Sequence, residues 1–196
     1  MMPAVRFFGR DTRGVTLIEF ALIAPALLIA LMGLMDLGYN LYTNAQLQGA
    51  IQKAARDSTI EDPGSRVGDL DNRVAEAVRV IAPHSTMQFD RSAYSNFRDV
   101  AQPEDFTDTN DNGVCDAGEP FEDANGNGTW DNDRGNAGPG GARDAVLYTV
   151  TVDYERLFPV ARLIGLDGNF RLVAVTVLRN QPYGLQAERT EIGNCA

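Results

Sequence analysis

The sequence predicts an α+β protein in which a long N-terminal helix, apolar and then amphipathic, packs on a small antiparallel sheet. Three observations carry this prediction. The N-terminal part holds a long apolar run, the second half holds alternating apolar residues, and a dense acidic stretch lies between them. We expect a leader at residues 1–14, a long helix at 15–58 and an α+β domain at 59–196 that contains an acidic insert at 104–135.

The apolar run extends from Val15 to Met35, a length of 21 residues. A bilayer core needs about 20 helical residues, so the run is long enough for one transmembrane helix. Arg6, Arg10 and Arg13 precede the run, and the positive-inside rule places such residues in the cytoplasm. The sequence therefore predicts a single-pass membrane protein with a cytoplasmic N-terminus and a C-terminal domain on the other side.

A cleavable secretory signal is the alternative for this segment. Its apolar region normally has about 7–15 residues and ends at a small-x-small site. This run is longer and ends at Met35-Asp36-Leu37-Gly38, where no such site is clear. The helical pattern also continues, because apolar residues recur at three- and four-residue steps at Leu47, Ala50, Ile51 and Ala54. One helix of about 45 residues, half in lipid and half in water, fits this pattern better than a discarded signal.

The residues that open the run, Arg13-Gly14-Val15-Thr16-Leu17-Ile18-Glu19-Phe20, resemble the processing site of type IV pilins and their relatives. In that family a peptidase cuts after the glycine, and the carboxylate five residues later faces the new α-amino group of a neighbouring subunit. The resemblance implies that Gly14, Val15 and Glu19 serve processing and assembly. A carboxylate in an apolar bundle is costly unless it is paired, so the new ammonium would offset that cost. The alternative is an uncleaved anchor whose Glu19 extends to the headgroups.

The wider stretch from Arg13 to Ser58 resembles the TadE-like family of pseudopilins, minor components of tight-adherence (Flp) pilus assembly and secretion systems. The matching features are Arg13-Gly14, Glu19-Phe20-Ala21, Pro25, Asp36 with Gly38, and Ala54-Ala55-Arg56, with a weaker echo at Arg179–Gly184. The resemblance implies a structural protein of the bacterial inner membrane with a pilin-like fold and a periplasmic or extracellular domain. Its implied partners are other pilin-like subunits, pilus assembly proteins and a prepilin peptidase.

The remainder of the chain predicts one further helix and three strands. Apolar residues at helical spacing precede Pro83 and mark a second helix, at Leu70, Val74, Ala77, Val78 and Ile81. Thr86–Asp90 is a short strand candidate. Alternation predicts a strand at Val146–Val152 and another at Phe170–Leu178, with Val173, Val175 and Val177 on one face. Glu155–Ile164 is a candidate helical connection and Asp167-Gly168-Asn169 a turn.

The acidic insert accounts for nearly all of the net charge of −10. Residues 101–135 contain ten Asp or Glu and the single base Arg134, a local balance of −9. Such a block repels itself unless cations hold it together. Because phosphate binding needs a basic surface, the block argues against nucleic acid as a partner.

The insert contains a stretch, Asp108 to Glu119, that fits the twelve-residue EF-hand pattern at every position of the template. The pattern places ligands at positions one, three, five, seven, nine and twelve, with glycine at six. Gly113 stands at six, and the ligand positions hold Asp108, Asn110, Asn112, Val114, Asp116 and Glu119. Oxygen ligands at this spacing are typical of calcium, so we expect a calcium site here. The alternative is a solvated loop that uses Asp, Asn and Gly as turn formers.

A second, incomplete copy begins at Asp123. The matching ligand positions hold Asp123, Asn125, Asn127, Thr129 and Asp131, and Gly128 stands at six. Position twelve is Arg134, so Asp133 or Glu122 is the candidate replacement carboxylate. Neither copy has convincing flanking helices. Both resemble the compact calcium repeats of exported bacterial proteins more than a calmodulin-type EF-hand. The expected role of the metal is structural.

The two cysteines, Cys115 and Cys195, either form a disulfide outside the cytoplasm or stay as separate thiols. With the one histidine, His84, they make a poor zinc set. The sequence shows no nucleophile elbow, phosphate loop or zinc signature, and we expect no enzymatic activity. Two other interpretations remain open: an uncleaved anchor that displays a calcium-dependent adhesion or binding domain, and an exported hydrolase that uses the metal of the acidic loop.

Overall fold

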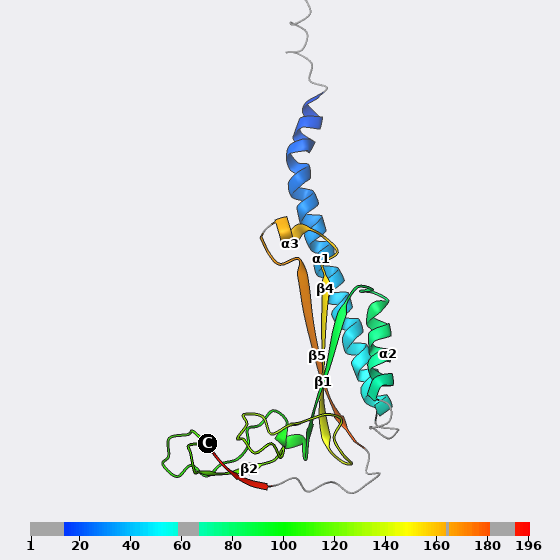
Figure 1. Cartoon of the computed structure of the whole chain (residues 1–196). Coiled ribbons are helices and arrows are strands. Elements are labelled where there is room, and N and C mark those ends of the chain that lie inside the picture. The colour runs from blue at the N-terminus through cyan, green and yellow to red at the C-terminus, as the bar shows by residue number, and fades with distance from the viewer. Residues whose placement is uncertain (1–13, 59–66, 164, 181–190) are drawn as a thin grey trace, which may run out of the picture. The chain divides into compact units, whose positions relative to one another are not determined.

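The computed structural model describes residues 14–58, 67–163, 165–180 and 191–196 (Figure 1). The expected leader arginines, Arg6, Arg10 and Arg13, lie outside this part of the chain, as does most of the Arg179–Gly184 motif. The chain divides into two compact units. One comprises the segment up to Tyr42 together with Glu155–Phe170, and the other comprises Thr43–Tyr154 together with Arg171–Ala196.

Helix α1 (Val15–Ser58) has 44 residues, which confirms the predicted long helix. It continues through Pro25 and is long and apolar enough to cross a membrane. The side chains of its most apolar stretch are exposed, for example Leu17 and Leu22. Because water disfavours a long exposed apolar helix surface, this helix suggests membrane anchoring.

In the second unit, the C-terminal part of α1 lies beside helix α2 (Val67–Arg79), as Figure 1 shows. Leu47 and Ile51 of α1 and Val74 and Val78 of α2 are almost fully buried. Burial of each such side chain contributes about 1.5–3 kcal/mol. This layer confirms the predicted periodicity of both helices.

The main sheet has the strand order β3-β1-β4-β5. Its strands are β1 (Thr86–Tyr94), β3 (Asn136–Ala137), β4 (Ala145–Glu155) and β5 (Asn169–Arg179). Strand β1 pairs antiparallel with β4, with Phe89 opposite Val150. Short helices lie at η3 (Phe97–Asp99) and α3 (Val160–Leu163). The α+β class is confirmed, and each predicted strand exists with longer bounds than the sequence indicated.

The faces of the sheet follow the period-two pattern. Strand β4 buries one set of alternate residues, namely Val146, Tyr148, Val150, Val152 and Tyr154. Strand β5 buries Leu172, Ala174 and Leu178 and leaves Val173 and Val175 about half exposed, at 54% and 48%. The valine face that the sequence singled out on this strand is therefore the solvent-facing one.

A second sheet joins the acidic insert to the C-terminus. Strand β2 (Pro120–Asp123) pairs antiparallel with β6 (Glu191–Asn194), and Phe121 lies opposite Gly193. The Phe121 ring is buried and occupies the space that a Cβ at Gly193 would need. An isolated bridge also pairs Phe106 with Phe121. These contacts hold the insert as a folded element of the second unit.

Candidate functional site

The expected processing site lies at the first turn of α1. Gly14 immediately precedes Val15, the first residue of the helix. Glu19 follows Val15 by four residues, so the two share one helix face, and both are exposed. A Cβ built on Gly14 would meet no atom within 4 Å. The structure thus leaves the Gly14–Val15 bond accessible at the start of an apolar helix.

The first acidic residue after the apolar run is held by an ion pair. Asp36 is buried, and it pairs with Arg156 and accepts a hydrogen bond from the Asn40 amide at 3.3 Å. The Arg156 guanidinium also lies over the Phe170 ring, 4.6 Å from its centroid. The pair ties the Glu155–Phe170 segment to α1. The sequence pattern marked Asp36, but nothing in it indicated Arg156 as the partner.

The first acidic loop wraps its side chains around backbone N–H groups. The Asp108 carboxylate accepts hydrogen bonds from Asn112 N and Gly113 N at 3.2 and 2.7 Å. The Gly113 bond is the main reason that the pKa of Asp108 is lowered from its usual value. Gly113 has φ +77, a conformation that favours glycine and sets the sharp turn expected at position six. The Asp108 carboxylate therefore holds the turn at Gly113 through backbone hydrogen bonds.

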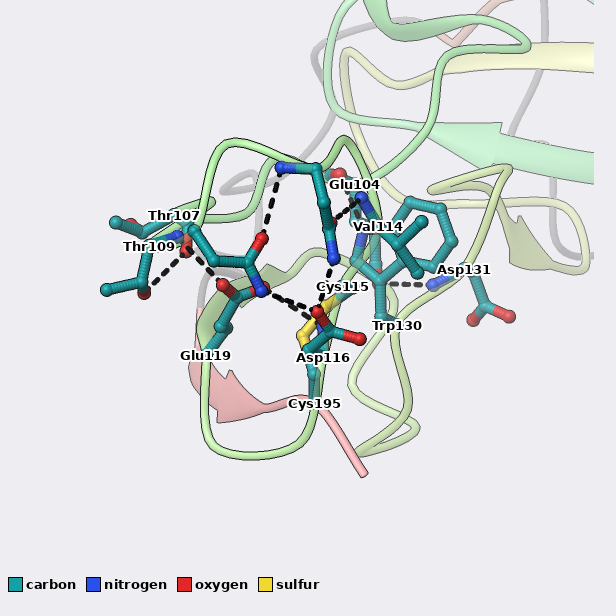
Figure 2. Close-up of a disulfide and its surroundings, with 12 residues drawn as sticks. Glu104, Thr107, Thr109, Val114, Cys115, Asp116, Glu119, Trp130, Asp131 and Cys195 are labelled. Carbon is teal, nitrogen blue, oxygen red and sulfur yellow. Dashed lines mark hydrogen bonds between the residues drawn. A yellow bond between two sulfur atoms is a disulfide. The ribbon is translucent and has the colours of Figure 1, made fainter.

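Glu119 closes the first loop from its far end (Figure 2). One carboxylate oxygen accepts Thr109 N at 2.7 Å, and the other accepts Asp116 N at 3.0 Å. These two amides belong to positions two and nine of the loop. The side chain is only 6% exposed, and no cation pairs with it in the part of the chain that the structure describes.

Two asparagines of the first loop direct their amide nitrogens inward. Asn110 Nδ2 and Asn112 Nδ2 donate to Asp116 Oδ2 at 2.8 and 2.7 Å, while each Oδ1 accepts a backbone N–H. Within the described residues, no group of three or more His, Cys, Asp or Glu side chains is gathered as a metal site. The loop in this form is closed by hydrogen bonds.

The second acidic loop repeats the same bonds. Asp123 accepts Asn127 N and Gly128 N at 3.1 and 2.9 Å, as Asp108 does in the first loop. Asn125 and Asn127 donate their amides to Asp131, the counterpart of Asp116. The two loops thus make the same hydrogen bonds up to position nine. They differ at position twelve, which is Glu119 in the first loop and Arg134 in the second.

The bonds that Glu119 makes in the first loop are made in the second loop by Glu104. Its two carboxylate oxygens accept Ala124 N at 2.8 Å and Asp131 N at 3.0 Å. Ala124 and Asp131 occupy positions two and nine of the second loop. Glu104 is only 1% exposed. The sequence interpretation missed this residue, because it lies 19 positions before Asp123, outside any continuous twelve-residue window.

The two replacement candidates named from the sequence do not make these bonds. Asp133 accepts the Tyr94 hydroxyl at 3.0 Å and Gly135 N at 3.0 Å. Glu122 lines a small polar cavity of about 190 Å³ with Tyr94 and Arg134. Neither carboxylate bonds to the backbone amides of the second loop.

The disulfide between Cys115 and Cys195 links the first loop to the residue that directly follows strand β6 (Figure 2). The two Cα atoms are 5.7 Å apart, within the normal range. Cys195 N also donates to Glu119 O at 2.8 Å, and Gly118 N donates to Cys195 O at 2.9 Å. The C-terminus therefore supports the position-twelve residue of the first loop.

Comparison with known proteins finds a family similar to the N-terminal helix. No curated protein and no solved structure matches the chain. The family described as TadE-like protein matches residues 14–56, which begin at the expected processing glycine and end two residues before the end of α1. The match confirms the resemblance over this segment and points to a pseudopilin-like protein associated with Tad pilus assembly. Residues 14–56 of this chain are thus similar to TadE-like proteins, and the match does not extend to the rest of the chain.

Proposed function

We propose that this protein is a minor pseudopilin of a tight-adherence pilus assembly and secretion system, processed at Gly14 and carrying an exported, calcium-stabilised domain. The observation that carries the proposal is the TadE-like match at residues 14–56, coincident with one exposed apolar helix. The N-terminus lies in the cytoplasm of a bacterium, the helix crosses the inner membrane once, and the second unit lies outside. The role is structural, through contacts with other pilin-like subunits.

Processing at the Gly14–Val15 bond creates the charged group that pairs with Glu19 during assembly. Cleavage by a prepilin peptidase leaves an ammonium on Val15 beside the apolar surface of α1. Glu19 carries the complementary charge at the fifth position of the mature chain, and in a bundle of subunits it pairs with the ammonium of a neighbour. Pairing in lipid stabilises both charges, because an isolated charge in that environment is costly.

The processing step is tested with two matched glycine substitutions in the full chain, expressed with a prepilin peptidase. Gly14→Ala and Gly33→Ala both add one methyl group where no atom lies within 4 Å, so neither disturbs the fold. We expect Gly14→Ala to abolish cleavage and Gly33→Ala to be cleaved like the native chain, as judged by electrophoretic mobility. Cleavage of the Gly14→Ala chain, or no cleavage of the native one, contradicts the proposal. The second outcome favours an uncleaved anchor that displays an adhesion domain.

Calcium binding to the acidic insert is supported by unpaired buried charge. Glu119 and Asp123 are 6% and 4% exposed, and in the described residues neither has a cationic partner. Arg134, the single base of the insert, pairs instead with Asp105 and Asp99. Buried carboxylates without a counter-ion are destabilising, and a hard divalent cation with oxygen ligands removes that cost. The ligands proposed are those of the two loop patterns.

A pair of substitutions in the first loop tests calcium binding. Glu119→Gln removes the position-twelve carboxylate, whereas Asp111→Asn removes the same charge at position four, which supplies no ligand. Asp111 has φ +58, a conformation that asparagine also tolerates. Calorimetric titration of the full chain in detergent should show calcium binding that Glu119→Gln weakens and Asp111→Asn preserves. No heat and no gain in melting temperature for the native chain would refute calcium binding.

A further inference from the structure

We infer that Glu104 is the missing twelfth-position carboxylate of the second loop, so that the insert binds two calcium ions through two equivalent sites. This inference rests on the calcium binding proposed above. It adds a ligand that no continuous sequence pattern contains. Its basis is an equivalence between Glu104 and Glu119, measured at the same two positions of each loop.

Glu104 and Glu119 make equivalent hydrogen bonds, atom for atom, in their two loops. In the first loop, Glu119 accepts the amides of positions two and nine at 2.7 and 3.0 Å. In the second loop, Glu104 accepts the amides of the same positions at 2.8 and 3.0 Å, one amide to each carboxylate oxygen. Each carboxylate oxygen keeps a further lone pair, which is what a bidentate calcium ligand needs. The carboxylate of Glu104 therefore faces the interior of the second loop in the way that a position-twelve glutamate does.

The burial of Glu104 is an independent indication of a cation. Its side chain is 1% exposed, and among the described residues no arginine, lysine or histidine pairs with it. A carboxylate that is removed from water without a counter-charge is strongly disfavoured, and two amide hydrogen bonds offset only part of that cost. A calcium ion that also takes oxygens of Asp123 and Asp131 would satisfy this site, although the three carboxylates are not gathered around one point in the described structure.

Arg134 explains how a carboxylate so far away in the sequence reaches the loop. It stands at position twelve, but its guanidinium turns away from the loop and donates to Pro103 O at 2.9 and 2.7 Å and to Asp105 at 2.8 Å. The backbones also pair, because Glu104 N donates to Asp131 O and Arg134 N donates to Gln102 O, both at 2.9 Å. The arginine thus clamps the segment that presents Glu104.

Trp130 provides a reporter for this loop. It is the single tryptophan of the chain, it occupies position eight of the second loop, and its indole donates to Glu104 O at 2.8 Å (Figure 2). Its ring also lies edge-on to the Phe106 ring, with the two ring centroids 5.7 Å apart. Terbium binds oxygen sites that accept calcium, and excitation of a nearby tryptophan makes bound terbium emit. Tryptophan-sensitised emission therefore reports terbium bound close to Trp130, which is itself a residue of the second loop.

The test compares Glu104→Gln with Glu122→Gln and Asp133→Asn in the full chain in detergent, using calcium titration and terbium emission. We expect two calcium ions in the native chain and in both control variants. Glu104→Gln should bind one ion and lose the sensitised emission, while Glu119→Gln should bind one ion and keep the emission. Two ions with unchanged emission in Glu104→Gln would overturn the inference, as would loss of the second ion in either control.

Two further outcomes separate this inference from the proposed function. A native chain that binds no calcium refutes calcium binding as a whole, whereas a native chain that binds one ion without sensitised emission refutes only the second site. If Glu104→Gln disrupts the whole insert and binds nothing, the variant that combines Glu104→Gln with Arg134→Glu decides. This variant returns a glutamate to position twelve. Recovery of two ions supports the inference, and failure to recover the second ion overturns it.

Discussion

Tyr148 is the centre of a buried polar cluster in the second unit. Its hydroxyl donates to Asp71 at 2.7 Å, and Arg91 pairs with the same carboxylate while its guanidinium lies 4.4 Å from the Tyr148 ring centroid. Burial raises the pKa of Tyr148 above its usual value of 10.0, and the hydrogen bond to Asp71 adds to the rise. The cluster joins the face of β4 to α2.

We expect Tyr148→Phe to destabilise the second unit by about 1 kcal/mol at neutral pH, because one buried hydrogen bond is lost while Asp71 keeps Arg91. The native chain should also lose stability above about pH 10, since tyrosine then ionises in the unfolded state but not in the folded state. Tyr148→Phe should reduce this alkaline loss. Urea unfolding at neutral and alkaline pH measures both effects, with Tyr42→Phe at an exposed site as control. Equal alkaline loss in the native and Tyr148→Phe chains would contradict the assignment.

At the residue scale, local spacing in the sequence revealed the repeated pattern of the two loops, whereas it did not reveal long-range partners. The Asp, Asn and Gly positions of both loops followed from one spacing rule, and the structure shows them making matching hydrogen bonds up to position nine. The sequence did not indicate the roles of Glu104 and Arg156, because each contacts its partner only through tertiary folding. The partner of Asp36 lies 120 positions away, and no local periodicity encodes such a separation.

The disulfide-linked C-terminal strand is the element that closes the insert. Strands β6 and β2 pair although they lie far apart in the sequence. Each has only four residues, which is too few for an alternating pattern to predict a strand. The sequence therefore predicted α1, α2 and the long strands, whose periodicity extends over several turns or pleats, but neither β2 nor β6. It also left open which face of β5 is buried, because apolar residues occupy both faces.

We expect Cys195→Ser to destabilise the protein by about 2–4 kcal/mol, because the bond closes a long loop of the unfolded chain. Cys115 and Cys195 are separated by 80 positions. Thermal unfolding of the full chain under oxidising conditions measures the change. Cys115→Ser is the matched variant and should cost the same amount. If only one of the two variants loses stability, the loss comes from local packing at that cysteine and not from the disulfide.

The packing of α1 in the second unit gives a prediction for core burial. Ile51 is fully buried on α1, whereas Ile192 on β6 is 82% exposed. Ile51→Ala should therefore lower the free energy of unfolding by about 2–5 kcal/mol, and Ile192→Ala by less than about 0.5 kcal/mol. Urea unfolding compares the two variants. Equal losses would contradict the burial of this face of α1.

At the scale of the whole molecule, the chain combines a helix that matches a known family with an acidic insert that lies outside that match. Residues 14–56 match a known family, and the acidic insert lies well outside the match. The apolar helix α1 followed from hydropathy, because lipid imposes a length and a composition on any segment that could span it. The charge of the insert followed from composition, and the fold of its two loops depends on pairings with β6 and with residues 102–105 that composition does not show.

The N-terminal residue of the protein purified from its native membrane tests the central claim most directly. The account predicts a mature chain that begins at Val15, so that a free ammonium precedes the Glu19 carboxylate by four residues. Terminal sequencing together with the intact mass identifies this end without any substitution. A chain that begins at Met1, or anywhere else before Val15, would contradict the claim that this protein is a processed pseudopilin.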